Sequence, residues 1–254
     1  MLHLGSFQQL QNQTASSALA SAETRDWPAR FRELAASARD HRLKAFYSAG
    51  VASADTPLAA VPLMALDIET TGLDPVRDGI VSIGLVPMRL QRIRASQSRL
   101  WIVKPRVPLV EESVSLHGIT HSQIESAPDL IDILDDFLAA IAGHVLVVHC
   151  RAIERQFLNG ALQARIGEAI EFPVIDTMEL EARLHRCKPP GLIARLFGGR
   201  PLPSIRLAAS RRRYGLPRYR LHHALTDALA SAELLQAQIA HRFSPETALG
   251  ELWK

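Results

Sequence analysis

The distribution of short apolar runs along the chain restricts the fold more than any other feature of the sequence. Apolar runs of roughly 4–8 residues between turn-forming residues are typical of buried strands, whereas apolar residues spaced three and four apart are typical of amphipathic helices. Strands are predicted over residues 63–66, 80–87, 100–103, 145–148 and 172–175, and helices over 130–141, 153–166 and 224–241. Three strands in succession, followed by strands that alternate with helices, predict an α/β domain with a mixed five-stranded sheet flanked by helices. Strands 80–87 and 100–103 are expected to be antiparallel neighbours.

The rest of the chain is predicted to form appendages of this domain. The expected organisation is an N-terminal extension over residues 1–59, the main domain over 60–243 and a short C-terminal tail over 244–254. Residues 1–24 are rich in Ser, Ala, Gln and Asn and are expected to be loosely ordered. Apolar side chains between Trp27 and Tyr47 predict one or two amphipathic helices. The Gly and Pro residues between Lys188 and Pro201 predict a loop or an interrupted helix.

Composition excludes several classes of protein. Apolar residues make up 47% of the 254 residues, enough for a packed core. The two cysteines, Cys150 and Cys187, have no disulfide-scaffold or zinc-finger spacing. The N-terminal residues lack the pattern of a signal peptide, and no apolar run is long enough to span a bilayer. A cytoplasmic protein without a membrane partner is therefore predicted.

Basic residues are concentrated in one stretch of the sequence. Between Ala182 and Thr226 there are eleven Lys or Arg residues and no Asp or Glu. Guanidinium groups suit bidentate contacts with phosphate. Arg211, Arg212 and Arg213 are therefore predicted to bind the backbone of a nucleic acid, with a solvated helix face as the alternative.

Acidic residues follow two of the predicted strands. Asp67 and Glu69 come directly after strand 63–66 and, being two residues apart, project from the same face if extended. Two such carboxylates can bind a hard divalent cation through oxygen, although a solvated loop end has the same pattern. Glu154 lies one turn into the helix after strand 145–148, where the helix dipole alone also favours an acid.

A third group of polar residues precedes the last helix. Asp227 lies near the start of that helix, and His222 lies five residues earlier on the approach to it. A histidine near its ordinary pKa of about 6.5 can accept a proton at neutral pH. The alternative for the pair is a structural role, and for His223 it is a surface or capping role.

Together, these strings resemble one family of nucleases. LDIETTGLDP (66–75), HCRAIE (149–154) and HHALTDALA (222–230) resemble motifs of the DEDDh exonucleases, the RNase H-like nucleases that include the proofreading epsilon subunit of bacterial DNA polymerase III. SLHGIT (115–120) and VIDT (174–177) resemble further segments of this family. The resemblance covers about residues 60–243. It implies an RNase H-like fold and hydrolysis of phosphodiester bonds at the 3′ end of single-stranded DNA.

The resemblance also implies roles for individual residues. Two Mg²⁺ or Mn²⁺ ions would be held by the carboxylates of Asp67, Glu69, Glu154 and Asp227. His222 would be the general base that takes a proton from the attacking water. The resemblance implies substrate contacts for Thr70, Thr71 and His117.

Two residues depart from the family pattern, and several alternatives follow. Glu154 replaces the usual Asp and Cys150 the usual Asn of the second motif. The extra methylene of Glu can misplace a metal ligand, so a weakened nuclease that only binds nucleic acid is one alternative. An exoribonuclease of the same fold is another, because contact with a 2′-hydroxyl depends on pocket geometry. Residues 1–55 are the candidate region for a protein partner, unless Trp27 and Phe31 pack on the domain itself.

Overall fold

The computed structural model of the chain describes residues 25–109, 111–186, 203–220 and 222–254. Its centre is a mixed sheet in the order β3-β2-β1-β5-β6, with β4 also paired to β2. The strands are β1 (Leu63–Thr70), β2 (Ile80–Arg89), β3 (Arg92–Ile93), β4 (Arg99–Ile102), β5 (Val145–Val148) and β6 (Val174–Asp176). β3 and β4 pair with successive parts of β2, so the sheet has five strand positions, as predicted.

The pairing directions match the predicted mixed sheet. β2 is antiparallel to β1 and to β4, whereas β5 is parallel to β1 and to β6. β1 is longer than the predicted strand 63–66, because Asp67, Ile68 and Glu69 continue the ladder with β2. Backbone pairing does not depend on an apolar side chain, so the apolar run ended before the strand did.

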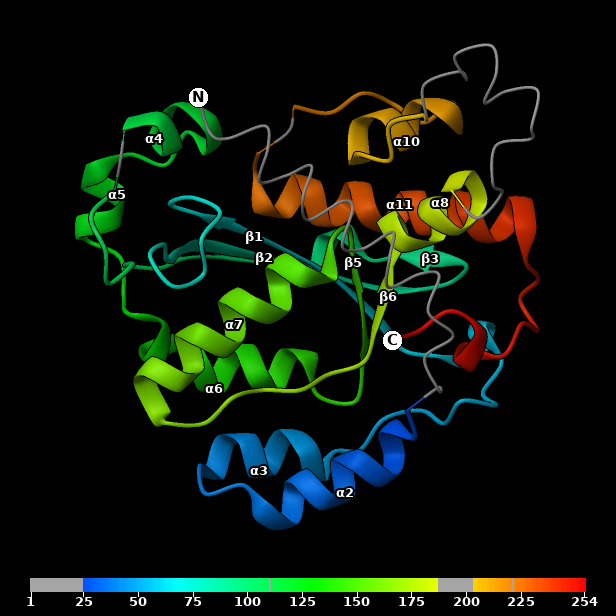
Figure 1. Cartoon of the computed structure of the whole chain (residues 1–254), viewed down its shortest axis with the longest axis horizontal. Coiled ribbons are helices and arrows are strands. Elements are labelled where there is room, and N and C mark those ends of the chain that lie inside the picture. The colour runs from blue at the N-terminus through cyan, green and yellow to red at the C-terminus, as the bar shows by residue number, and fades with distance from the viewer. Residues whose placement is uncertain (1–24, 110, 187–202, 221) are drawn as a thin grey trace, which may run out of the picture.

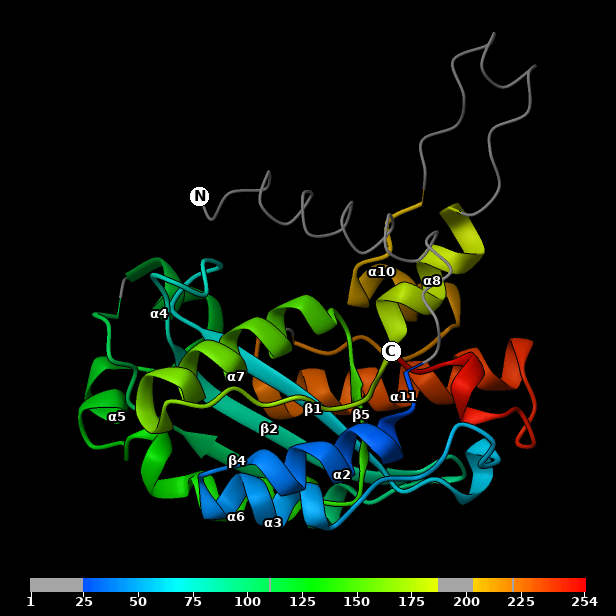
Figure 2. The same cartoon turned by 60° about the horizontal axis from the view of Figure 1, so that its bottom comes forward.

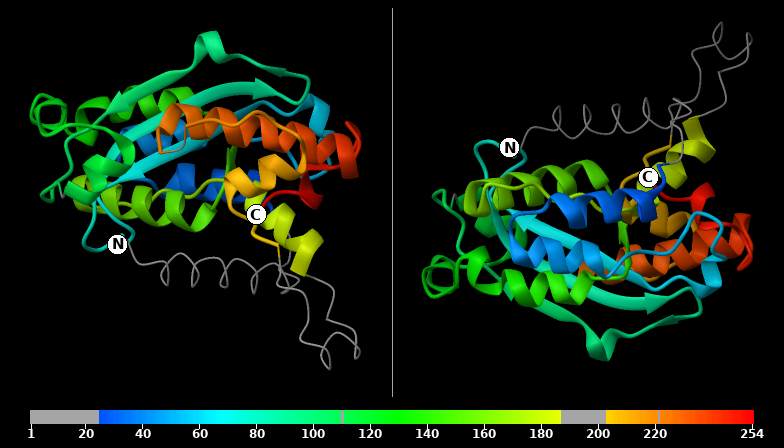
Figure 3. Two further views of the ribbon diagram at one scale, coloured as in Figure 1. Left: turned by 90° about the horizontal axis from the view of Figure 1, so that it is seen from above. Right: turned by 90° about the horizontal axis from the view of Figure 1, so that it is seen from below.

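Helices cover both faces of this sheet. The helices of the main domain are α4 (Glu111–His117), α5 (His121–Glu125), α6 (Leu130–Ile141), α7 (Arg151–Ile166), α8 (Thr177–Arg186), α10 (Leu207–Arg213) and α11 (Ala224–Arg242). Short 3-10 turns lie at Leu58–Ala60, Ala95–Gln97 and Leu249–Glu251. α11 crosses β2, β1 and β5 on one face, and α6 and α7 lie on the other side of the sheet (Figures 1 and 3).

Four of these helices were not predicted from the sequence. α4 and α5 are only seven and five residues long, too short for a clear apolar period. α8 buries Glu179 and Glu181, so its inward face contains charged residues. α10 has a buried arginine, Arg211, at its C-terminal end. Short length or buried charged residues therefore obscure the apolar pattern in these four helices.

The predicted N-terminal extension contributes two helices to the main hydrophobic core. α2 (Trp27–Ser37) and α3 (His41–Ser48) pack together, and α3 packs on α6 (Figure 2). Trp27 and Phe31 are each 2% exposed. Trp27 and Phe31 therefore pack on the domain itself, which was the alternative to their binding a protein partner. The predicted loose order of residues 1–24 concerns residues that lie outside the described part of the chain.

The predicted C-terminal tail packs against the same body. Trp253 is 2% exposed and forms a β-bridge with Ile175, and Lys254 exchanges backbone hydrogen bonds with Val174. The interrupted helix or loop predicted for 188–201 lies outside the described residues. None of the helices in the described part of the chain combines the length and apolar character that a membrane span requires.

Candidate active site

The C-terminal half of β1 carries the first two predicted ligands. Asp67 and Glu69 lie two positions apart on this strand, so their side chains share one face, while Ile68 between them is in the core. Glu69 is 8% exposed. The strand thereby places both carboxylates at the surface that α11 covers.

A glycine on the neighbouring strand lets α11 approach them. Gly84 of β2 pairs with Asp67 in the sheet register. A Cβ atom at Gly84 would lie 2.4 Å from the carbonyl carbon of Ala224, the first residue of α11. The backbone of the helix therefore rests on the bare strand beside Asp67, which brings Asp227, one turn further along, to the site. Glycine inside a strand pattern is the signal that could have identified this contact.

Gly84→Ala is expected to lower both the melting temperature and any activity of the site. The new methyl group meets helix backbone, which cannot rotate away as a side chain can. Overpacking of this kind costs about 1–3 kcal/mol, and a chain of this size loses roughly 2–4 °C per kcal/mol. Gly160→Ala in α7 is the matched control, since its Cβ would meet only the Pro75 carbonyl oxygen at 3.4 Å. Thermal unfolding of both variants checks this, and a wild-type melting temperature for Gly84→Ala would contradict it.

His222 and Asp227 form a compact unit at the N-terminus of α11. The backbone N–H of His222 donates a hydrogen bond to Asp227 Oδ2 over 2.8 Å. His222 has φ +67°, an uncommon conformation for a residue with a side chain. One ligand atom from each of Glu69, His222 and Asp227 lies within 4.8 Å of the others. The structure thus brings together residues that are 158 positions apart in the sequence, from 69 to 227.

Glu154 enters the same region from the first turn of α7. It is 3% exposed, and its Oε2 atom has no hydrogen-bond partner among the described residues. Cys150, the cap of this helix, has φ +145°, so the chain turns sharply between β5 and α7. The charge of Glu154 acts on Asp67, which places the two carboxylates within electrostatic range.

The electrostatics of this cluster suit the binding of a cation. Burial raises the pKa of Asp67 well above its ordinary value, and the charges of Glu69, Asp227 and Glu154 raise it further. Burial, followed by the charge of Asp227, raises the pKa of Glu69 to about 8. No described Lys or Arg forms an ion pair with any of these four carboxylates, and Asp227 Oδ1 is buried without a hydrogen-bond partner. Buried, unpaired oxygen ligands of this kind fit Mg²⁺ or Mn²⁺.

The three residues predicted to contact substrate support the loops beside this cluster. The Thr70 hydroxyl donates to the Gly72 carbonyl over 2.5 Å, and the Thr71 hydroxyl donates to Asp78 Oδ1 over 3.0 Å. His117 is 6% exposed, and its Nδ1 accepts a hydrogen bond from the Ile119 N–H. Burial, and then the charge of His222, lower the pKa of His117, so it is a neutral neighbour of His222. Their roles toward substrate remain predictions.

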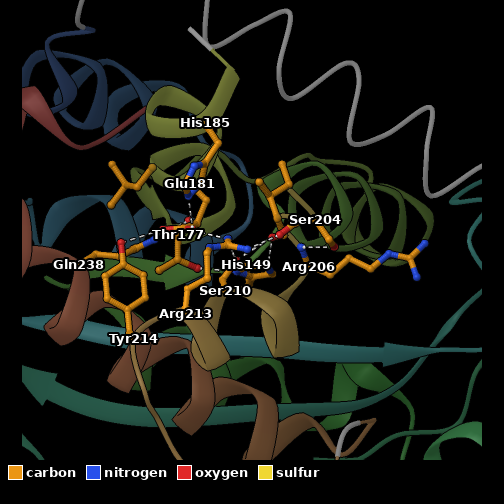
Figure 4. Close-up of polar contacts among 12 residues, drawn as sticks. His149, Thr177, Glu181, His185, Ser204, Arg206, Ser210, Arg213, Tyr214 and Gln238 are labelled. Atoms are coloured by element: carbon orange, nitrogen blue, oxygen red, sulfur yellow. Dashed lines mark hydrogen bonds and ion pairs between the residues drawn. The ribbon is translucent and has the colours of Figure 1, made fainter. Parts of the chain in front are cut away.

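The predicted arginine cluster requires a correction. Arg211 is 3% exposed and donates to the Ala230 carbonyl and to Glu233, so it holds α10 against α11 and is not available to phosphate. Arg213 forms an ion pair with the buried Glu181 (Figure 4). Arg212 and Arg213 are both exposed, but among the described residues Arg212 forms no ion pair. The three neighbours therefore differ, because one turn of a helix presents adjacent residues to different surroundings.

His149, the first residue of the second motif, has a structural position that the sequence did not reveal. Its Nδ1 lies 2.8 Å from Thr177 Oγ1 and its Nε2 lies 3.1 Å from the Ile205 carbonyl (Figure 4). Burial lowers its pKa to about 4, so the ring is neutral. The ring joins the end of β5 to the start of α8 and to the segment before α10. It thereby ties the strand before Glu154 to the basic part of the chain.

Comparison with known proteins agrees with this geometry. The sequence profile of the RNase T exonuclease family matches residues 64–235. The epsilon-like DNA polymerase III protein of Rhodobacter capsulatus is 31% identical over 72% of this chain and 24% of its own length. The PolC-type DNA polymerase III of Thermotoga maritima is 29% identical over 72% of this chain and 12% of its own length. The chain thus spans a quarter or less of these relatives.

Solved structures with the same fold include two exonucleases. Exonuclease X in complex with 5′ overhanging duplex DNA has a TM-score of 0.54 at 22% identity, over 74% of this chain and 97% of that one. The nuclease domain of 3′hExo, a DEDDh family member bound to rAMP, has a TM-score of 0.57 at 16% identity, over 71% of this chain and 92% of that one. These likenesses confirm the predicted RNase H-like fold. The profile match over residues 64–235, together with the 31% identical relative, identifies the chain as a member of the RNase T family of DEDDh 3′→5′ exonucleases, which are phosphodiester hydrolases.

Proposed function

We propose that this chain is a divalent-metal-dependent exonuclease that removes nucleotides from the 3′ end of single-stranded DNA. The observation that carries the proposal is a cluster of carboxylates from β1, α7 and α11 that has no basic partner among the described residues. Glu69, Glu154 and Asp227 are buried, and all three act electrostatically on the half-buried Asp67. Like charges held together in a folded protein lower its stability unless a cation or a proton neutralises them. A cluster of carboxylates that lowers the stability of the fold in this way is expected where the carboxylates serve catalysis.

Asp67, Glu69, Glu154 and Asp227 would hold the metal ions. Two divalent cations bound there would stabilise the charge on both the attacking and the leaving oxygen of an in-line displacement at phosphorus. The protein contributes rigidity, since Asp67 and Glu69 belong to a central strand and Asp227 is fixed by its hydrogen bond from His222. Positioning of this kind accounts for much of the catalysis of phosphoryl transfer.

His222 would accept the proton of the attacking water. Its side chain is exposed, so it can meet both solvent and a bound 3′ end. One of its ring nitrogens lies within 4.8 Å of a carboxylate oxygen of Glu69 and of Asp227. The fixed left-handed backbone at His222 sets the direction of its side chain. The neutral His117 beside it adds no second charge.

The proposal of DNA as substrate draws on the relatives. The curated relatives are DNA polymerase III proteins, and Exonuclease X was solved with duplex DNA. The 3′hExo domain, in contrast, was solved with rAMP. RNA is therefore the second substrate to test.

The deciding experiment uses single strands labelled at either end. The purified chain is incubated with 5′-labelled and 3′-labelled DNA and RNA of equal sequence, with Mg²⁺, Mn²⁺ or a chelator. We expect the 3′ label to be released at once as a labelled mononucleotide, and the 5′-labelled strand to shorten stepwise into a ladder. Cleavage should be faster for DNA than for RNA and should not occur with chelator. Internal cuts, release from the 5′ end, or cleavage in chelator would contradict the proposed function.

Glu154→Asp is expected to keep metal-dependent activity within about tenfold of wild type, a barrier change of roughly 1.4 kcal/mol. Asp presents the same carboxylate on a shorter stem from the same turn of α7, so the charge that balances the metal remains. Glu154→Gln keeps the length and removes the charge, and we expect it to lose far more, with partial rescue by excess Mn²⁺. Rates measured across a metal titration compare the two. Wild-type activity of Glu154→Gln would mean that Glu154 is no ligand and would favour the weakened-nuclease alternative.

A further inference from the structure

We propose that the hollow beside α10 binds the backbone of the substrate strand, a few nucleotides away from the 3′ end held at the carboxylates. This inference rests on the proposed function and names a second contact for the same substrate. The hollow has a volume of about 450 Å³ and lies between α10 and the segment from Gly215 to Tyr219. Tyr219, its last lining residue in the chain, precedes His222 by three positions.

The walls of the hollow suit a nucleotide unit. Arg206, Arg212 and Arg218 line it, and none of its described lining residues is acidic. The small or apolar residues Ala208, Ala209 and Leu216 lie between the basic side chains. A phosphodiester pairs its negative charge with guanidinium groups while its sugar and base cover apolar surface, and such backbone contacts position a strand without reading its sequence.

Two of these arginines are suited to bind a ligand, in contrast to their neighbours. Arg211 and Arg213 are neutralised by Glu233 and Glu181. Arg212 and Arg218 are exposed, and within the described residues no ion pair engages either of them. The ion-paired arginines hold α10 in place, and the arginines without an ion pair give the hollow its net positive charge. This division assigns phosphate contacts to Arg212, one of the three predicted residues, and to Arg218, which was not predicted.

The position of the hollow along α11 fits the path of a strand. Arg211, which forms part of its wall, bonds to Ala230 and Glu233, three and six residues after Asp227. At about 1.5 Å per helical residue, the hollow lies beside α11 on the order of 5–10 Å along the axis from that ligand. A strand advances by about 3.4 Å per nucleotide in B-form and further when extended, so the hollow is within a few nucleotides of the 3′ terminus. A dinucleotide has a single phosphodiester, the one to be cleaved at the carboxylates, so it offers no phosphate to the hollow.

The test compares substrates of two lengths in one double variant, Arg212→Ser with Arg218→Ser. The long substrate is an oligothymidylate of about twenty nucleotides, which exceeds typical single-strand sites of roughly 4–16 nucleotides. The short one is the thymidine dinucleotide. We expect kcat/KM for the oligomer to fall about tenfold relative to kcat/KM for the dinucleotide, and the salt slope of oligomer binding to fall by about 1.4, or roughly 0.7 per lost phosphate contact.

A matched control removes the same charge elsewhere. Arg92 and Arg94 are exposed on and beside β3, which pairs with Met88 and Arg89 at the C-terminal end of β2, away from Gly84 in the middle of that strand. Changing both to Ser should leave the length selectivity and the salt slope as in wild type. Equal values for the double variant of the hollow and this control would overturn the inference.

Binding separates this inference from the proposed function. Fluorescence anisotropy of the labelled oligomer in chelator measures affinity without cleavage. If wild type cleaves nothing but the hollow variant still lowers affinity and salt slope, the proposed function fails and the hollow stands. If wild type cleaves but the hollow variant binds with the wild-type slope, the hollow fails and the function stands.

Discussion

Asp67→Asn is expected to abolish metal-dependent release of nucleotides and, at the same time, to raise the melting temperature of the metal-free protein. Asp67 lies on the central strand, and the charges of Glu69, Asp227 and Glu154 all act on it. Asn has nearly the same shape, so the strand and its packing are kept while one of the four like charges is removed. Loss of an essential ligand removes the reaction, whereas loss of repulsion stabilises the apo fold.

The stability of the metal-free protein should also depend on pH in a defined direction. Burial and the charge of Asp227 raise the pKa of Glu69 to about 8, so the folded protein retains a proton that the unfolded chain loses above about 4.5. The contribution of Glu69 to the free energy of unfolding is therefore fully present below pH 4.5, and it is lost as the pH rises through about 8. Thermal unfolding in chelator between these values should show a melting temperature that falls with rising pH. Asp67→Asn should flatten this dependence.

A matched control distinguishes the site from a general effect of charge. Asp135 is exposed on α6, with 69% of its side-chain surface accessible and only weak contacts to His41 and Arg42. Asp135→Asn should change neither the activity nor the melting temperature, since exposed ion pairs contribute little. Near wild-type activity for Asp67→Asn, or an equal rise in melting temperature for both variants, would mean that the four carboxylates are not a metal site.

Much of the fold follows from local sequence patterns. The helix predicted over 130–141 and the strand over 145–148 have the same bounds in the structure, because their buried faces consist of apolar residues throughout. The two-residue spacing of Asp67 and Glu69 was sufficient to place both on one face, since strand geometry has a period of two. Patterns of this kind depend only on neighbours in sequence. They predict single helices and strands well, and they predict less well which helices and strands contact one another.

Apart from the two short helices α4 and α5, the features that the sequence did not predict depend on partners distant in the chain. Arg211 and Arg213 resemble a phosphate-binding cluster until their partners Glu233 and Glu181, 22 and 32 residues away, are seen to face them. In sequence, α8 does not resemble a buried helix, because it carries the charged residue Glu181. In the structure, arginines from α10 and α11 neutralise this charge and allow it to be buried. A charge that is paired in three dimensions is indistinguishable in sequence from one that faces solvent. The residues that come together at the site were therefore predictable where a motif carried them, and the basic surface was not.

His222→Asn is expected to lower kcat by roughly 10²–10⁴-fold at neutral pH, the usual contribution of a positioned proton acceptor. Asn is chosen because it tolerates a left-handed backbone, so the φ of +67° and the hydrogen bond from the residue 222 N–H to Asp227 Oδ2 are kept. An Ala variant would combine loss of the imidazole with strain at this position. The metal ligands stay in place in His222→Asn, so metal affinity should change little while the rate falls.

His223 supplies the matched control from the adjacent position. It is exposed, has an extended backbone, and its Nδ1 meets only the Thr226 hydroxyl at 3.4 Å. His223→Asn should therefore keep kcat within about threefold, well below the effect of losing a general base. Single-turnover rates of both variants, with metal titrations, separate proton transfer from metal binding. A larger loss at residue 223 than at 222, or a wild-type rate for His222→Asn, would show that the proton of the attacking water goes elsewhere. An equal loss of rate and metal affinity at residue 222 would instead make His222 a ligand of the Glu69–Asp227 group, whose atoms lie within 4.8 Å of its own.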